Sequence, residues 1–513
     1  MLATAHSATL LGLASYPVRV EVEAHRGPPD FELVGLAEAS VRESRVRVRS
    51  ALKQLNVDIS ECVIIINLGP ADLRKHGSGF DLAIAGAVLA AMREIPNDAL
   101  LDVLLLGELS LDGTVHPLRG TLAHLAAAKK RGVKRAIVPR ANEAEAAMVD
   151  GIEVAAVANL RELVLAWRSK QTLPPVPHQD LYLTSHDDSV DLEEVRGQLV
   201  ARRALEVVAA GGHNLLMMGP PGAGKTMLAR RLPTILPPLT SDEALDVTSI
   251  HSVAGTLGST LPPRRPFRAP HHTVSDVALI GGGGDTPRPG EVSLAHHGVL
   301  FLDELAEFKR TALEGLRQPI EDGEVLVSRA RVKVTFPARP VLVCATNPCP
   351  CGYFGDPSQR CACSRERVRS YRARLSGPLL DRLDVQLTLP PVDVASLWAS
   401  KKGESSAQVR ERVLSARAIQ YSRYARGEVS GRTSAALSVR DLERVAVLSR
   451  DTASMLAVAM ERLELSARAC GKIVRVARTI ADLAGDGAIA RLHMAEAISM
   501  RTLDRPVAQS AVA

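Results

Sequence analysis

The sequence lacks the features of a membrane-spanning or secreted protein. It has no run of about 18 apolar residues, the length that a bilayer crossing requires. Its first residues do not have the charged-then-apolar layout of a signal peptide. Internal repeats and long low-complexity tracts are also absent. We therefore expect a cytoplasmic protein with no membrane partner, in which thiols stay reduced and disulfides are not formed.

The composition is that of a globular protein with a mild basic excess. The 513 residues are 46% apolar and 23% charged, which allows roughly two to four domains with cores of their own. The net charge of +6 and the pI near 9.0 permit nucleic acid as a partner without requiring it, because solvated helices often carry extra arginine.

Three blocks and one linker divide the chain. Residues 1–168 mix strand-like runs with Ala-rich helical stretches. Residues 169–190 are rich in proline, polar residues and aspartate, and this composition predicts an exposed linker. Strands and helices alternate over residues 191–393, which predicts an α/β domain with a parallel sheet. Residues 394–513 are helical by period and composition.

A phosphate-binding loop follows an apolar strand of the third block. In HNLLMMGPPGAGKTMLARRL the loop leads directly into a helix, a context that speaks against a chance match to a Gly-rich turn. Loop N–H groups wrap phosphates, Lys225 reaches the β and γ oxygens, and the Thr226 hydroxyl can hold Mg²⁺. The predicted nucleotide-binding residues are Gly219, Pro220, Pro221, Gly222, Ala223, Gly224, Lys225 and Thr226, with Asp303 from a later strand.

Later segments supply residues for hydrolysis. The strand GVLFLDELAEF ends in Asp303, expected to hold the metal through water, and Glu304, expected to polarise the attacking water. The strand RPVLVCATN ends in Asn347, which is placed to orient that water. In SGPLLDRLDVQL, Arg382 is either a surface ion pair or an arginine finger that enters the site of a neighbouring subunit.

Four of the 7 cysteines crowd into NPCPCGYFGDPSQRCACS, directly after the strand that ends in Asn347, which is called the sensor strand below. They are Cys349, Cys351, Cys361 and Cys363. Four thiolates suit a closed tetrahedral Zn²⁺ site. The alternatives are a redox switch, or buried small side chains, which fit poorly in a loop with glycine and proline. A loop with so little core to bury needs a cross-link to be ordered. A bound metal would fix the distance between Asn347 and Arg382.

In chain order, the motifs at 219–226 and 299–304, Asn347 and Arg382 resemble an AAA+ ATPase module. More narrowly, RPFRAPHHTVSDVALIGGGGDTPRPGEVSLAHHGVLFLDEL and NPCPCGYFGD resemble the YifB/ComM family of magnesium-chelatase-like AAA+ ATPases, over essentially the full chain. The resemblance implies an α/β fold, an AAA+ P-loop core with a C-terminal helical lid. It also implies ATP and Mg²⁺ as cofactors and a ring, a homo-hexamer, with ATP at subunit junctions.

The same resemblance implies elements that face a central pore. One is an insert within 250–295, and the other is a hairpin before the sensor strand. The segment 321–340 independently predicts a hairpin, with the Asp-Gly pair at 322–323 as its turn. Alternation along the strand would place three cations on one face. That face would either contact DNA phosphates or simply be exposed to solvent. These DNA-contact candidates are Arg329, Arg331 and Lys333.

In the lid segment LSARACGKIVRVARTIADLAG, Arg468 resembles the second sensor arginine of AAA+ ATPases. In those proteins this arginine contacts the γ-phosphate. Arg475 and Arg478 lie further along the same helix and could substitute for it. The resemblance leaves open whether this arginine acts in its own subunit or the next.

The first block resembles the proteolytic domain of Lon proteases, an α+β domain of ribosomal S5-like fold. The resemblance rests on residues 67–91 and 105–142. Lon uses a Ser–Lys dyad. Where the resemblance places the serine this sequence has Gly79, one position after Ser78, and where it places the lysine it has Leu122. A hydroxyl without that amine has no general base, so we expect a proteolytically inactive scaffold.

Three functions fit these features. The first is an ATPase motor on DNA, because ComM-like relatives drive branch migration of incoming single strands in recombination. Seven arginines between 360 and 382 agree with it. Few aromatic residues accompany them, so contacts would go to phosphates and be non-specific and salt-sensitive. The second is a chelatase subunit that inserts Mg²⁺ into a porphyrin-like ring, and the third is a remodeller of protein partners.

Overall fold

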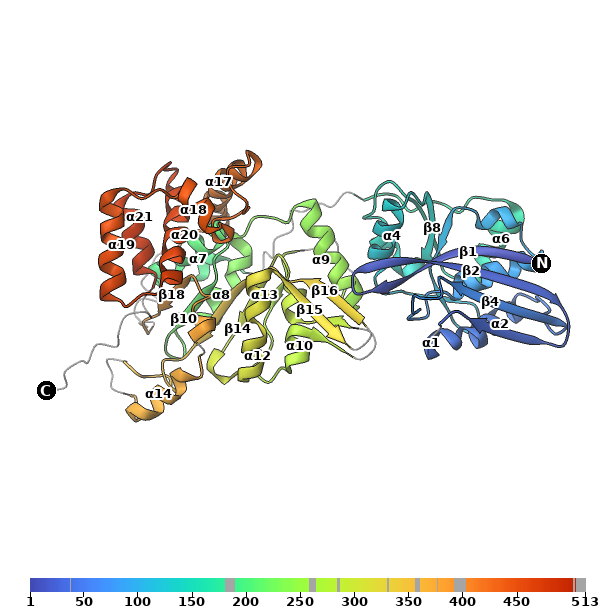
Figure 1. Ribbon diagram of the computed structural model, residues 1–513, viewed down its shortest axis with the longest axis horizontal. Coiled ribbons are helices and arrows are strands. Elements are labelled where there is room, and N and C mark those ends of the chain that lie inside the picture. The colour runs from blue at the N-terminus through green and yellow to red at the C-terminus, as the bar shows by residue number, and fades with distance from the viewer. Residues whose placement is uncertain are drawn as a thin grey trace.

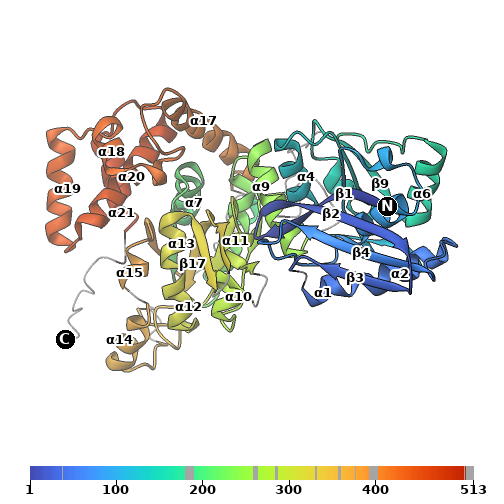
Figure 2. The same ribbon diagram turned by 45° about the vertical axis from the view of Figure 1, so that its right-hand side comes forward.

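A computed structural model describes residues 1–36, 38–179, 190–257, 264–283, 287–329, 332–355, 360–375, 377–391, 403–501 and 503. Figures 1 and 2 show an N-terminal lobe in blue, a central lobe in green to yellow, and a helical lobe in red. Within the described residues, none of the helices combines the length and apolar character that a bilayer crossing requires.

The N-terminal lobe is built on a mixed sheet of 7 strands in the order β3-β4-β2-β1-β5-β8-β9. The strands are β1 (Leu2–Leu11), β2 (Ala14–Arg26), β3 (Asp30–Val34), β4 (Cys62–Gly69), β5 (Val103–Leu105), β8 (Arg135–Pro139) and β9 (Glu153–Val157). Strand β2 pairs antiparallel with β1 and β4, and the other neighbours are parallel. This is the mixed sheet that the Lon-like prediction requires.

Helices cover this sheet. Helix α3 (Asp81–Ala91) is buried along its whole length, which explains why its sequence has no polar face. The other helices are α1 (Ala39–Arg42), α2 (Ser44–Gln54), α4 (Thr121–Lys130), α5 (Glu143–Ala146) and α6 (Leu160–Ser169), and β6 (Glu108–Leu109) with β7 (Val115–His116) forms a small hairpin.

The segment predicted as an exposed linker, residues 169–190, partly belongs to the N-terminal lobe. The Val176 N–H donates to the Val154 carbonyl (2.7 Å), which places this part of the segment along β9. Leu173 packs against the apolar core of the lobe. Composition alone cannot reveal such contacts, because isolated apolar residues in a polar stretch leave no periodic pattern. Residues 180–189 lie outside the described part of the chain.

The central lobe contains a parallel sheet of 5 strands in the order β11-β14-β17-β10-β18. The strands are β10 (Leu215–Met218), β11 (Phe267–Arg268), β14 (Val299–Leu302), β17 (Val341–Thr346) and β18 (Val385–Thr388). Strands β10 and β14 are buried at every residue, as expected for a sheet covered on both faces. Because all strands run the same way, their carboxyl ends meet at one edge.

Helices surround the sheet in this lobe. They are α7 (Leu199–Gly211), α8 (Lys225–Ile235), α9 (Ser241–Ala254), α10 (Asp276–Ile280), α11 (Glu291–Leu294), α12 (Arg310–Gly315), α13 (Arg317–Asp322), α14 (Arg365–Ala373) and α15 (Gly377–Leu380). Two small hairpins accompany them, one of β12 (Gly281–Gly282) with β13 (Arg288–Pro289), the other of β15 (Glu324–Arg329) with β16 (Val332–Pro337).

The hairpin β15–β16 exists, but its predicted turn was wrong. Asp322 ends helix α13, and Gly323 is the helix C-cap rather than a hairpin turn. An Asp-Gly pair serves both purposes, because glycine also ends helices. In the observed register Lys333 pairs with Ser328, and Arg329 pairs with Val332. Paired residues share a face and successive residues alternate, so positions 333 and 329 belong to opposite faces of the hairpin. The predicted single basic face is therefore also wrong.

Of the three DNA-contact candidates on this hairpin, Lys333 is exposed. For Arg329 the structure describes only the backbone, and Arg331 lies outside the described residues.

The C-terminal lobe is helical, as predicted. It contains α17 (Ser406–Ala425), α18 (Val439–Val445), α19 (Arg450–Arg462), α20 (Ala467–Ala484) and α21 (Arg491–Ser499). A buried polar cluster joins it to the central sheet: Lys472 Nζ lies 2.6 Å from Asp384 Oδ1, and His213 Nε2 lies 2.7 Å from Thr479 Oγ1. Burial acts to raise the pKa of Asp384, but the Lys472 and His213 charges outweigh it and hold that pKa below its usual range.

Helix α9 connects the central and N-terminal lobes, beside α4 in both views (Figures 1 and 2). Near its end, Ser252 Oγ accepts a hydrogen bond from the Gly120 N–H (2.9 Å) and donates one to Glu145 Oε2 (2.5 Å). Near its start, Arg265 Nη2 pairs with Glu243 Oε2 (3.0 Å). The helix is thus attached to both lobes.

Candidate nucleotide-hydrolysis site

The phosphate loop leaves the carboxyl end of β10 and closes at the first residue of α8. Gly222 and Gly224 have φ values of 79° and 80°, a left-handed conformation that strains any residue with a Cβ. The backbone can therefore turn around a phosphate, and the N-terminus of α8 adds partial positive charge. The segment 219–226 has the strand–loop–helix geometry on which its predicted role depends.

Lys225 links the phosphate loop to the sensor strand. Its Nζ donates to the carbonyls of Gly219 (2.7 Å) and Pro220 (3.0 Å) and to Asn347 Oδ1 (3.1 Å). Burial lowers the pKa of Lys225, although nearby carboxylates pull it the other way. The adjacency of β10 and β17 in the sheet produces this meeting of two residues that are far apart in sequence.

Thr226 and Asp303 form the predicted metal pair. Thr226 Oγ1 donates to Asp303 Oδ2 at 2.7 Å, so a hydroxyl and a carboxylate converge where oxygen ligands of Mg²⁺ are expected. These donors fit a Mg²⁺ ion that is held jointly by the protein and by substrate phosphates. Glu304 follows at the same edge, with its side chain 53% exposed.

Arg382 lies at the amino ends of the strands, whereas the phosphate loop lies at their carboxyl ends. Its carbonyl accepts from Asn214 Nδ2 (3.3 Å), and Asn214 directly precedes β10. Its guanidinium contacts the Glu321 carboxylate and the Arg317 carbonyl. Strand β10 alone separates the two edges by about 13 Å. The structure therefore does not bring Arg382 to the phosphate loop of its own chain.

Arg468 is exposed near the start of α20. Its two substitutes are engaged elsewhere: Arg475 donates to the Leu437 carbonyl (2.8 Å), and Arg478 is fully buried with Asp482. Lys472, one turn after Arg468, pairs with Asp384, two residues after Arg382. Arg468 and Arg382 therefore stand on neighbouring segments.

The four cysteines come together. Sγ–Sγ distances are 3.3 Å for Cys349–Cys351, 3.8 Å for Cys349–Cys361 and 3.6 Å for Cys351–Cys361, and all four sulfurs, including Cys363, lie within 4.8 Å of one another. Sulfurs about 2.3 Å from a tetrahedral Zn²⁺ are about 3.8 Å apart, whereas a disulfide needs about 2.05 Å. The donor set is consistent with a zinc site and not with disulfides.

The cysteine loop touches the nucleotide site at a position that the sequence prediction missed. A Cβ on Gly352 would lie 2.5 Å from Pro221 Cδ, so only glycine permits this approach of the two loops. Arg372 of α14 donates to the Pro348 carbonyl (3.2 Å) and lies over the Phe354 ring. The signal in the sequence was the glycine directly after Cys351.

Tyr371 was also missed. It is buried on α14. Burial raises the pKa of Tyr371, although hydrogen bonds with the Thr346 side chain and the Asn347 backbone act to lower it. Val368 and Tyr371, three residues apart, form the buried face of this otherwise arginine-rich helix. Tyr371 thus ties α14 to the end of the sensor strand.

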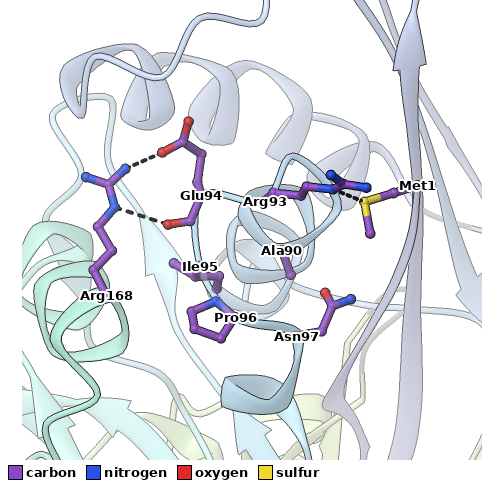
Figure 3. Close-up of a pocket in the computed structure, with 8 residues that line it drawn as sticks. All are labelled: Met1, Ala90, Arg93, Glu94, Ile95, Pro96, Asn97 and Arg168. Carbon is purple, nitrogen blue, oxygen red and sulfur yellow. Dashed lines mark hydrogen bonds and ion pairs between the residues drawn. The ribbon is translucent and has the colours of Figure 1, made fainter.

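The pocket in Figure 3 belongs to the N-terminal lobe and not to this site. It has a volume of about 420 Å³ and is lined by Met1, Ala90, Arg93, Glu94, Ile95, Pro96, Asn97 and Arg168. Figure 3 shows Arg168 paired with Glu94 and Arg93 directed at the Met1 sulfur. Both of its arginines therefore interact with other residues that line the pocket.

The protease-like position has no dyad geometry. Ser78 Oγ donates to the Glu108 carboxylate, and Leu122 is buried at the start of α4. Gly79 packs against Leu118. These contacts agree with the predicted loss of peptidase chemistry, which stays a prediction.

A parallel sheet with a phosphate loop, an acidic strand end and a helical lid defines an AAA+ ATPase, and comparison with protein families places it in the magnesium-chelatase type. Family models agree with this class. "Magnesium chelatase, subunit ChlI" matches residues 191–397, "Subunit ChlI of Mg-chelatase" matches residues 20–142, and "Magnesium chelatase, subunit ChlI C-terminal" matches residues 403–501.

Comparison with full-length relatives narrows the class. The chain is 42% identical to YifB of Salmonella typhimurium and 41% identical to the competence protein ComM of Haemophilus influenzae, each over 98% of both chains. It therefore belongs to the YifB/ComM family of magnesium-chelatase-like ATPases. Lon protease 2 of Bacillus subtilis is 30% identical over 145 residues, which are 27% of this chain and 26% of the protease. The N-terminal region thus distantly resembles Lon protease.

Proposed function

We propose that the chain is an ATP-hydrolysing motor that works on DNA as a homo-hexameric ring, with residues 191–393 as its core and 394–513 as its lid. One observation carries this proposal. Lys225, Asp303 and Asn347 meet at one edge of the sheet, whereas Arg382 stands at the other. A complete hydrolysis site then requires two chains, which a ring supplies at every junction.

Each residue has a role in the proposed reaction. Lys225 binds the β and γ oxygens, and Glu304 accepts a proton from the attacking water that Asn347 orients. Arg382 of the neighbouring chain stabilises charge on the transferring phosphoryl group, with Arg468 as a second contact. Thr226 and Asp303 would hold a Mg²⁺ ion, which would neutralise phosphate charge.

Two findings support DNA as the partner. A full-length relative carries the name competence protein, and helix α14 exposes Arg365, Arg367 and Arg369. Because these cations have few aromatic neighbours, we propose non-specific contacts to phosphates of single-stranded or branched DNA. Branch migration in recombination or natural transformation, a helicase activity, is the specific role proposed.

The test measures DNA binding and ATP turnover with forked and Holliday-type DNA. Changing Arg365, Arg367 and Arg369 together to alanine should weaken binding and reduce the slope of log K against log salt by about 2–3. A control removes the same charge from exposed lid positions, Arg440, Arg444 and Arg450, and should leave the slope unchanged. DNA that neither binds nor raises turnover would exclude the proposal.

Metal insertion is the second candidate, because all three matching family models are described as chelatase subunits. Magnesium-dependent insertion into a porphyrin-like ring by the chain together with partner subunits, with no effect of DNA on turnover, would favour it. Turnover raised by a folded protein would instead favour a remodeller of protein partners.

A further inference from the structure

A histidine that the proposed mechanism does not use lies against the proposed general base. His272 Nδ1 is 3.3 Å from Glu304 Oε2. The two residues reach each other because β11 pairs in parallel with β14. His272 follows the end of β11 and Glu304 follows the end of β14, so both lie at the carboxyl edge of the sheet.

The His272 ring packs against two other rings. The His271 ring has its centroid 4.0 Å away, and the Phe308 ring meets it edge-on at 6.5 Å. The backbone is fixed as well, because the Val274 N–H donates to the His271 carbonyl (2.9 Å) in a tight turn. These contacts restrain the imidazole independently of Glu304.

Glu304 has few restraints of its own. Its side chain is 53% exposed, whereas that of His272 is 29% exposed. Its backbone is left-handed, with φ of 53°, and its N–H donates to Asp303 Oδ1 at 2.9 Å. Among the described residues, His272 is the one side chain that forms an ion pair or hydrogen bond with the Glu304 carboxylate.

We propose that His272 is a positioning residue for ATP hydrolysis, which holds the Glu304 carboxylate in the direction of the attacking water. This inference rests on the proposed role of Glu304 as the base. An exposed glutamate has several rotatable bonds, and only a fraction of its rotamers suit proton transfer. Fixing such a side chain in advance is worth about tenfold in rate.

The test compares steady-state hydrolysis by the full chain. H272A should lower kcat about tenfold and leave the KM for ATP and the affinity for a fluorescent ATP analogue within about twofold. The reason is that β14 and β17 lie between β11, which His272 follows, and β10, which the phosphate loop follows. H272Q, whose amide can donate to the carboxylate, should recover most of the rate. H116A is the matched control, since His116 is exposed on the N-terminal lobe, and it should behave as wild type.

A double-mutant cycle with E304Q separates positioning from a general loss of structure. In the E304Q background H272A should have no further effect, because there is no longer a base to position. The same tenfold loss in both backgrounds would overturn the inference. If H272A fails to fold, H272F keeps the ring packing without a donor and should show the same loss.

The outcomes distinguish this inference from the proposed function. E304Q with wild-type turnover would overturn the role of Glu304, and the role of His272 with it. An inactive E304Q beside an H272A with unchanged kcat would overturn only the role of His272. An H272A with increased kcat would also overturn it, because His272 would then restrain hydrolysis.

Discussion

Mixing two inactive variants should restore ATP hydrolysis if the site is divided between chains. K225A removes the phosphate-binding amine from one half of a junction, and R382A removes the finger from the other half. Each variant alone should be inactive, with a loss of about 10³-fold for R382A. R382A should still bind nucleotide, because Arg382 lies at the opposite edge of the sheet from the phosphate loop.

The fraction of ATPase activity that the mixture should recover follows from the division of each site between two chains. In a random equal mixture, about half of the junctions take their phosphate loop from an R382A chain, and about half of these take their arginine from a K225A chain. About one quarter of all junctions are then complete, whatever the number of chains in the ring. The mixture should therefore reach about 25% of the wild-type rate at equal total protein.

The assay is ATP turnover after the variants have been dissociated together and reassembled. A mixture of K225A with E304Q is the control: both lesions lie in the same half of the junction, so no complete site forms and no activity should return. A K225A and R382A mixture that stays as inactive as its components would refute the divided site.

Three further predictions concern stability and the metal loop. The purified chain should contain one zinc ion, and C361S should lose it in metal analysis because three sulfurs bind it far more weakly. G352A should weaken ATP binding in a fluorescence titration while zinc stays bound, since the added Cβ meets Pro221; unchanged affinity would contradict the contact. K472M should lower the free energy of unfolding by about 3 kcal/mol in urea, because Asp384 is left buried without its cation, and adding D384N should recover most of it. The depressed pKa of Asp384 makes this stabilisation present above about pH 4 and lost as the pH falls further, so an equal difference at low pH would count against the assignment.

Much of the site could be predicted from the sequence because parallel sheets follow a simple rule. Apolar strands buried on both faces are visible as continuous runs, and their carboxyl ends share one edge. Asp303 and Asn347 each end such a run, so their convergence on Lys225 and Thr226 required no knowledge of side-chain packing.

Other features depend on contacts that a local pattern does not encode. The Asp322–Gly323 pair ends a helix here, and the dipeptide by itself does not distinguish a helix end from a hairpin turn. The contact of Gly352 with Pro221 joins two loops of which neither has a periodic pattern. The pairing of Arg382 with Glu321 depends on how α13 lies beside the end of α15.

Helix α9 is attached to a different lobe at each of its ends. The Arg265–Glu243 pair holds its start in the ATPase core, and Ser252 holds its last turn to Gly120 and Glu145 of the Lon-like lobe. A helix attached at both ends links the positions of the two lobes. The Lon-like lobe and the magnesium-chelatase-like ATPase core are therefore connected mechanically through α9, so that a displacement of one lobe bears on the other.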